Sequence, residues 1–175
     1  MTASLADGAV RLDTSTMRRS MTSAGLLMFR KKTDAVEVLL VHPGGPYFRK
    51  KDDGFWTVPK GEAAEDEDLQ ARAKIEFEEE LGFKPTENWI ALGSVKQKGG
   101  KTVHAWAFEG DVAPDFQLAS NSFEMEWPPG SGRTQQFPEI DQARFFALEL
   151  ARSKINQAQV VFLDRLREAL EREGQ

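Results

Sequence analysis

The chain has 175 residues, a net charge of -5 at pH 7 and no cysteine. A chain of this length is expected to form one domain with a buried core, and the lack of cysteine excludes disulfides and thiolate metal sites. The acidic pI of about 5.2 argues against tight binding to duplex nucleic acid. No apolar run approaches the ~18 residues of a membrane helix. We therefore expect a cytoplasmic protein with no membrane partner.

The first half of the chain predicts an extension followed by a hairpin. Residues 1–20 are polar and without periodicity, and they are predicted to be an N-terminal extension of a single domain over residues 21–175. Residues 23–30 and 36–42 are continuous apolar runs, which predicts paired strands covered on both faces. Residues 43–58 are predicted to be a glycine-rich, charged loop that becomes a short strand from residue 54.

The stretch from Lys60 to Gly82 is the most charged part of the chain, with nine acidic and three basic residues. Its second half, residues 69–81, is predicted to be a helix. Asp68 can cap the N-terminus of this helix, and Gly82 can adopt the left-handed conformation that ends it. The first half, residues 61–68, is predicted to be a loop that leads into the helix.

Three acids of this helix share one face. Glu76, Glu79 and Glu80 stand at i, i+3 and i+4, a spacing at which like charges destabilise a helix. A hard divalent cation removes this conflict, because Mg²⁺ takes oxygen ligands and also binds substrate phosphates. The alternative is a solvated acidic face, which is what most charge runs are. The pattern alone leaves both interpretations open.

The second half of the chain predicts more strands and a closing helix. Strands are predicted over residues 89–97, 102–108, 122–127 and 144–147, a loop over 128–138, and a helix over 156–172. Strands and helices alternate without internal repeats. This order predicts an α/β fold with a mixed sheet, and the two helices are expected to pack on opposite faces of the sheet.

The spacing of the acidic stretch resembles the signature of the Nudix hydrolase superfamily, G-x5-E-x7-R-E-U-x-E-E-x-G-U, in which U is a bulky aliphatic or aromatic residue. The residues in register are Gly61, Glu67, Glu76, Phe77, Glu79, Glu80, Gly82 and Phe83. The preceding FWTVPKGE is similar to the diadenosine polyphosphate hydrolase and MutT-like branches. The resemblance implies an α/β/α sandwich, with a mixed β-sheet between helices, and hydrolysis of a nucleoside diphosphate linked to another group, with Mg²⁺ or Mn²⁺ as cofactor.

The resemblance also implies roles for the acids. Glu76, Glu79 and Glu80 are implied as metal ligands, together with the backbone oxygen near Lys60 and Gly61. Such carboxylates act by holding metal ions that clamp phosphates and lower the pKa of bound water. Glu76 is implied to be either a ligand or the general base.

Two further acids lie outside this ligand set. Glu67 is expected to orient the loop or the helix. Glu139 resembles in position the loop acid that many family members use as an extra ligand or base, and a surface loop acid is the alternative. The general base is therefore open between Glu76, Glu79 and Glu139.

Three cations are candidates for binding the phosphates of a small nucleotide substrate. Lys60 stands beside the glycine of the signature, and Arg49 and Lys51 lie in the loop before it. Lysine can contact a phosphate as a point charge and arginine as a fork. For the two loop residues, a solvated surface is the alternative.

One position departs from the signature: the arginine is replaced by Ile75. Arg72 stands one turn before Glu76 and is predicted to supply the missing positive charge, with a weak surface ion pair as the alternative. The departure also leaves open a catalytically weak, nucleotide-binding module with the same fold. Dinucleoside polyphosphates, oxidised nucleoside triphosphates, nucleotide sugars and capped RNA ends all remain candidate substrates, and the oligomeric state is not predicted.

Overall fold

The structure, a computed structural model, describes residues 21–175, so the predicted extension over residues 1–20 lies outside the described residues. The strands are β1 (Thr22–Lys31), β2 (Val36–Pro43), β3 (Lys60–Glu62), β4 (Ile90–Lys96), β5 (Thr102–Glu109), β6 (Ser122–Glu126), β7 (Thr134–Pro138) and β8 (Ile140–Ala147). The helices are α1 (Leu69–Leu81), α2 (Leu148–Lys154) and α3 (Val160–Glu173), with a 3-10 turn, Gln157–Gln159, before α3.

A mixed sheet forms the centre of the fold, with strand order β4-β5-β1-β2-β8. β1 runs parallel to β5 and antiparallel to β2. The predicted β1–β2 hairpin is confirmed, and β4 also pairs antiparallel with β5. β1 pairs with β2 through its last residues and with β3 through Ser23, Ala24 and Gly25. This split places the short β3, which carries Gly61, beside the central strand.

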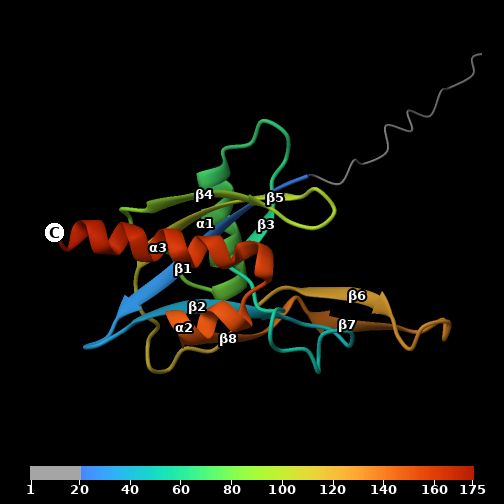
Figure 1. Ribbon diagram of the computed structural model, residues 1–175. Coiled ribbons are helices and arrows are strands. Elements are labelled where there is room, and N and C mark those ends of the chain that lie inside the picture. Colours follow the sequence, from blue (N-terminus) through green and yellow to red (C-terminus); the bar gives the residue numbers. More distant parts are fainter. Residues whose placement is uncertain (1–20) are drawn as a thin grey trace, which may run out of the picture.

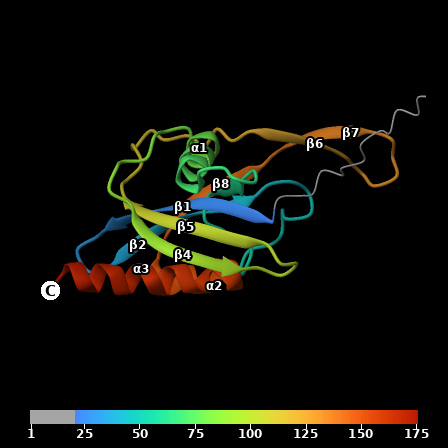
Figure 2. The same ribbon diagram turned by 90° about the horizontal axis from the view of Figure 1, so that it is seen from above.

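Helices cover both faces of the sheet, as predicted (Figures 1 and 2). α1 packs on one face through Ala73, Phe77 and Leu81, which share a core with Leu26, Met28, Leu39 and Phe108. α2 and α3 pack on the other face, where Ala151, Phe162, Leu163 and Leu166 meet Leu27, Leu40, Trp56 and Phe146. The result is the α/β/α sandwich expected from the sequence, and burial of these side chains is its main stabilising contribution.

The predicted loop over residues 128–138 is partly wrong, because Thr134–Pro138 forms β7 and pairs with β6. Four of the five β7 residues are exposed and only Phe137 is buried, where its ring lies 6.1 Å from that of Phe123. This sequence lacks the apolar alternation that marks a half-buried strand. The β6–β7 hairpin projects beyond the main sheet (Figure 1).

Other boundaries also differ from the prediction. Residues 54–58 form only isolated bridges, Val41 to Thr57 and Trp56 to Ile155, and the strand begins later, at Lys60. β8 begins at Ile140 instead of residue 144, because β2 pairs with it along its length. The closing helix begins at Val160, and α2 was not predicted. α2 is only 7 residues long, too short to show a helical period in the sequence.

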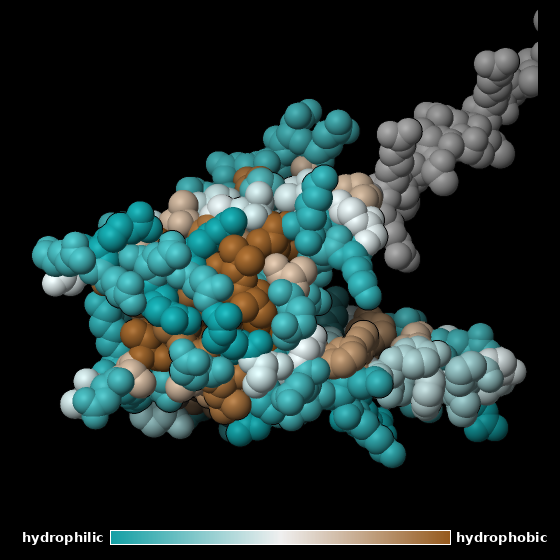
Figure 3. All heavy atoms as spheres, viewed as in Figure 1, coloured by the Kyte–Doolittle hydropathy of each residue, from teal (hydrophilic) through white to brown (hydrophobic). Residues whose placement is uncertain are grey.

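The face shown in Figure 3 is mostly hydrophilic, with hydrophobic residues exposed around α2 and α3. Leu150 of α2 is 50% exposed and Val161 of α3 is 40% exposed. Scattered exposed apolar residues of this kind are normal on soluble surfaces. Within residues 21–175, no helix is both long enough and apolar enough to cross a membrane.

Candidate functional site

The acidic helix α1 begins and ends where the sequence predicts. The Asp68 side chain accepts a hydrogen bond from the Ala71 backbone at 3.1 Å, which caps the N-terminus. Gly82 ends the helix with φ of 82°, and its N–H donates to the Glu78 carbonyl at 2.8 Å. Both ends are thus fixed by local contacts. The acids of α1 are carried on a rigid element that packs against the sheet.

Glu76 lies directly over the backbone of β3. A Cβ atom placed on Gly61 would be 1.9 Å from Cδ of Glu76, far inside contact distance. Glycine therefore leaves room for this carboxylate, and any larger residue at position 61 would have to displace it. At this contact the first residue of the signature, on β3, meets the helix that carries the acids.

Glu80 is the most unusual acid of the site. Its side chain is buried and its Oε2 atom has no hydrogen-bond partner among residues 21–175. Burial, together with the nearby Glu76 carboxylate, raises the pKa of Glu80 to about 9. Burial also raises the pKa of Glu76, against the opposing effect of Arg72. An unpartnered buried carboxylate oxygen is costly, and a bound cation would satisfy it.

Lys60, Glu79 and Glu139 surround this pair. Burial lowers the pKa of Lys60, whose ammonium group interacts with the carboxylates of Glu80 and Glu76. Glu139 is exposed, and its charge raises the pKa of both Glu76 and Glu80, so it lies near them. Glu79 is exposed on α1, and its charge also raises the pKa of Glu76. The structure therefore brings Lys60 and Glu139 to the acids of the helix.

Arg72 bridges the loop and the helix. Its Nε donates to Glu67 Oε1 at 2.7 Å, and its guanidinium contacts Glu76 Oε1 at 3.2 Å. Glu67 in turn accepts a hydrogen bond from the Ala64 backbone at 2.8 Å through its other oxygen. The hydrogen bond from Arg72 lowers the pKa of Glu67, so it favours the charged form of this carboxylate. Ile75 is 40% exposed on the adjacent face of α1.

Arg49 and Lys51 lie elsewhere. They line a cavity of about 250 Å³ with His42, Lys50, Gln142 and Arg144. Gln142 and Arg144 belong to β8, which pairs with β2 at His42. Sequence reasoning missed Arg144 because pairing between strands a hundred residues apart in the chain leaves no local signal.

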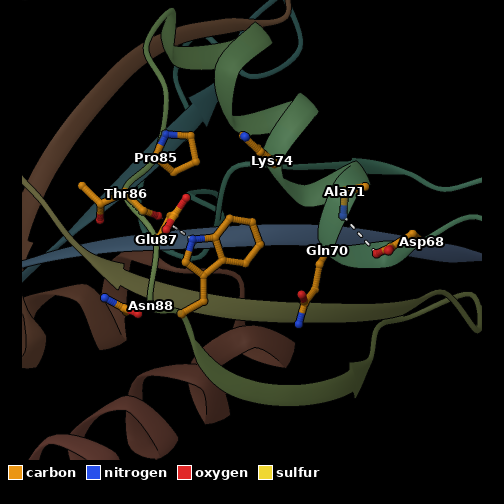
Figure 4. Close-up of a pocket in the computed structure, with 9 residues that line it drawn as sticks. Asp68, Gln70, Ala71, Lys74, Pro85, Thr86, Glu87 and Asn88 are labelled. Atoms are coloured by element: carbon orange, nitrogen blue, oxygen red, sulfur yellow. Dashed lines mark hydrogen bonds between the residues drawn. The ribbon is translucent and has the colours of Figure 1, made fainter.

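A cavity of about 440 Å³ lies beside the first turns of α1 (Figure 4). Gln70, Ala71 and Lys74 line one side, and the segment from Pro85 to Trp89 lines the other. The indole N–H of Trp89 donates to the Thr86 carbonyl at 2.7 Å. None of the glutamates of the signature lines this cavity. By helical spacing, its α1 residues lie on the side of the helix away from Glu76.

The oxygen atoms of the acidic site are of the kind that binds a hard divalent cation, but their side chains do not converge on one point. Carboxylate oxygens and a backbone carbonyl are the ligands that Mg²⁺ and Mn²⁺ prefer. Within residues 21–175, no three acidic or histidine side chains converge into a ready-made metal-binding group. Two observations favour a cation here. Oε2 of Glu80 has no hydrogen-bond partner among the described residues, and the Glu76 carboxylate packs against Gly61.

Comparison with known proteins places this site in a family. The sequence profile of the NUDIX domain matches residues 19–166. Among solved structures, the fold is similar to an Ap4A hydrolase of C. elegans in a binary complex, with 21% identity, a TM-score of 0.61, and coverage of 85% of this chain and 98% of that one. No curated protein sequence is similar enough to count as a relative.

Two further solved structures share the fold. One is the MutT protein of Methanosarcina mazei, with 20% identity, a TM-score of 0.55, and coverage of 89% of this chain and 98% of that one. The other is the NUDIX domain of Shewanella oneidensis NrtR complexed with ADP ribose, with 14% identity, a TM-score of 0.57, and coverage of 91% and 94%. From the profile match, which covers most of its length, this chain belongs to the NUDIX domain family, and its fold agrees with this assignment.

Proposed function

We propose that this NUDIX protein is a hydrolase that cleaves a nucleoside diphosphate linked to another group, with Mg²⁺ or Mn²⁺ as its cofactor. The observation that carries the proposal is the buried Glu80 carboxylate, which has an oxygen without a partner among residues 21–175 and lies near Glu76, whose own carboxylate packs against Gly61. Glu76, Glu79, Glu80 and the carbonyl of Gly61 are the proposed ligands. Bound metal would neutralise phosphate charge and supply an activated water.

Hydrolysis of a phosphoanhydride depends more on positioning and charge than on covalent chemistry. Lys60 is proposed to hold a substrate phosphate, because its ammonium group faces the same acids that would hold the metal. Arg72 keeps Glu76 oriented through their 3.2 Å contact. The attacking water must lose a proton, and the exposed carboxylates of Glu79 and Glu139 can accept it. Glu76, already engaged by Arg72, is a third candidate base.

The proposed substrate is a small nucleotide, either a dinucleoside polyphosphate or a nucleoside triphosphate, including an oxidised one. The motif before Gly61 and the similarity of fold to an Ap4A hydrolase and a MutT protein support this choice. Arg49 and Lys51 are also proposed to contact anions, and they lie in a cavity of their own. A nucleotide-binding module without turnover is the alternative that the experiment below excludes or supports.

A substrate panel tests the proposal. Dinucleoside polyphosphates, nucleoside triphosphates and ADP-ribose are incubated with the full chain in Mg²⁺, in Mn²⁺ and in chelator, and the products are separated by chromatography. We expect turnover of at least one compound with metal and none in chelator. Nucleotide binding without turnover of any compound would support the binding module and contradict the proposed hydrolysis.

A further inference from the structure

A second cluster of charge, opposite in sign to the acids of α1, surrounds the 250 Å³ cavity between the β2–β3 loop and β8. In Figure 1 this loop leaves β2 beside the base of the β6–β7 hairpin. Arg49, Lys50 and Lys51 line the cavity from the loop, and Arg144 lines it from β8. We call these four residues the basic cluster.

The basic cluster has no internal neutralisation. Among residues 21–175, none of its four side chains has a carboxylate or other hydrogen-bond acceptor as a partner. The nearest acid in the cavity, Asp52, is already engaged, because it accepts hydrogen bonds from the Trp56 indole at 2.8 Å and from Lys154 at 2.7 Å. Four cations around one hollow repel one another, so the fold gains no stability from gathering them.

The cavity wall is held in place. His42, which is 1% exposed, contacts Asp141 Oδ1 through Nδ1 at 2.7 Å and the Lys51 carbonyl through Nε2 at 2.6 Å. The His42 ring therefore connects the loop that carries Arg49, Lys50 and Lys51 to β8, the strand that carries Arg144. Lys154 secures the same loop by ion pairs with Asp52 and Asp53. A pre-ordered cluster loses little conformational freedom when it binds a ligand.

The basic cluster is separate from the acids of α1. Side chains alternate along a strand, so Gln142, Arg144 and Phe146 of β8 point to the same face of the sheet. Phe146 packs in the core under α2 and α3, whereas Glu80 belongs to α1 on the other face. The guanidinium of Arg144 lies 5.7 Å from the centre of the Phe146 ring, which agrees with this orientation.

We propose that the basic cluster binds a phosphoryl group at a site distinct from the metal-binding acids. Arginine matches phosphate oxygens with its planar fork, and lysines add point charges. A cavity of about 250 Å³ accommodates one or two phosphoryl groups more readily than a whole nucleotide. The amide of Gln142 supplies a neutral donor on the same wall. The site does not depend on the reaction proposed above.

Calorimetric titration with inorganic pyrophosphate in metal-free buffer tests this site. Without metal, the acids of α1 repel the probe, so the titration reports on the basic cluster alone. We expect saturable binding that weakens at least tenfold in Arg144→Gln and in Arg49→Gln, because each removes a charge-assisted contact. Lys84→Gln, an exposed cation away from the cavity, is the matched control and should bind as the wild type does.

Absence of pyrophosphate binding, or equal affinity in Arg144→Gln and Lys84→Gln, would overturn the proposal. Thermal melting confirms that each variant is folded. A second titration, in Mg²⁺ with α,β-methylene ATP present, distinguishes the two sources of the phosphoryl group. Displacement of pyrophosphate supports a site for the substrate's own phosphates, and simultaneous binding supports a site for a second, free phosphate compound.

Discussion

At the scale of single residues, the site lacks the signature arginine at Ile75, and we propose that Arg72 compensates for it. The signature arginine is absent, yet a guanidinium still connects the loop acid Glu67 to the helix acid Glu76. Arg72 reaches Glu76 because its side chain projects between the directions of Glu76 and Glu79. Position 75 lies beyond Glu79. Arg72 thus carries a positive charge about one helical turn before position 75, where the signature has its arginine.

A double-mutant cycle tests this relocation. Arg72→Ala should lower turnover and weaken Mg²⁺ binding by more than the ~0.2–1 kcal/mol of an exposed ion pair, because Glu76 loses the only ion pair that it forms among residues 21–175. Adding Ile75→Arg should restore part of both. Turnover and Mg²⁺ affinity of the two single variants and the double variant give the coupling energy. Strictly additive effects, or a harmless Arg72→Ala, would contradict the relocation.

The buried Glu80 predicts an unusual pH dependence for the metal-free protein. The unfolded chain loses this proton near the ordinary pKa of 4.5, and the folded protein holds it to about 9. Between these values the folded state binds the extra proton, so stability falls as pH rises, by at most about 1.4 kcal/mol per pH unit. Glu80→Gln cannot ionise and should flatten this fall.

Urea unfolding in chelator from pH 5 to pH 9 measures this effect. At pH 8 the Glu80→Gln variant should be more stable than the wild type, although it lacks a proposed metal ligand. Parallel stability curves for the two proteins would contradict the burial of an ionisable acid at this position. The expected gain in stability with loss of activity separates this variant from one that merely disrupts folding.

At the scale of elements, the site depends on the docking of α1 against β3. β3 is only 3 residues long, and it occupies the edge of β1 that β2 leaves free. Gly61 pairs with Ala24 there, while Phe77 and Leu81 anchor α1 in the core on the same face. Helix and strand therefore meet with a glycine at the contact point.

Gly61→Ala tests this contact. The new methyl group would overlap the Glu76 carboxylate and force it away from β3, at a cost of ~1–3 kcal/mol. We expect a folded but less stable protein that has lost most of its turnover and its stabilisation by Mg²⁺. Gly174→Ala, at the open end of α3 with a φ of -81°, is the matched control. Normal Mg²⁺ stabilisation in Gly61→Ala would show that the contact is dispensable.

The sequence predicted those elements whose signals are local. α1 could be bounded to the residue because its cap and its terminal glycine both act within one turn. β7 and the start of β8 could not, because their exposed residues become strand only by pairing with β6 and β2. The same reason applies to the two charged sites. The shared face of the acids on α1 follows from helical spacing, whereas Arg144 comes close to Arg49, Lys50 and Lys51 only through strand pairing in the sheet.

At the scale of the whole molecule, the sheet separates two charge clusters of opposite sign. The acids of α1 lie on one face with Lys60, and the basic cluster lies toward the other face with His42. A net charge of -5 therefore conceals a strongly uneven distribution. Binding of cations on one side and of phosphate on the other is the behaviour that this distribution favours.

Metal binding should stabilise the whole fold. A cation that binds only the native state raises the melting temperature in a concentration-dependent way, and here it would take the place of the proton that the folded protein holds on Glu80. Differential scanning calorimetry across a Mg²⁺ and Mn²⁺ series at low ionic strength measures the shift. A melting temperature indifferent to millimolar concentrations of both ions would support a solvated acidic face instead.

Turnover of Glu79→Gln and Glu80→Gln at saturating Mg²⁺ shows whether the acids of α1 support metal-dependent hydrolysis. Both substitutions remove a charge and conserve shape, and Glu168→Gln on the exposed side of α3 is the control. We predict that each of the two variants keeps the fold and loses turnover by about 100-fold or more, as expected for a major electrostatic contributor, while the control keeps wild-type turnover. Near-wild-type turnover in either Glu79→Gln or Glu80→Gln would contradict the assignment.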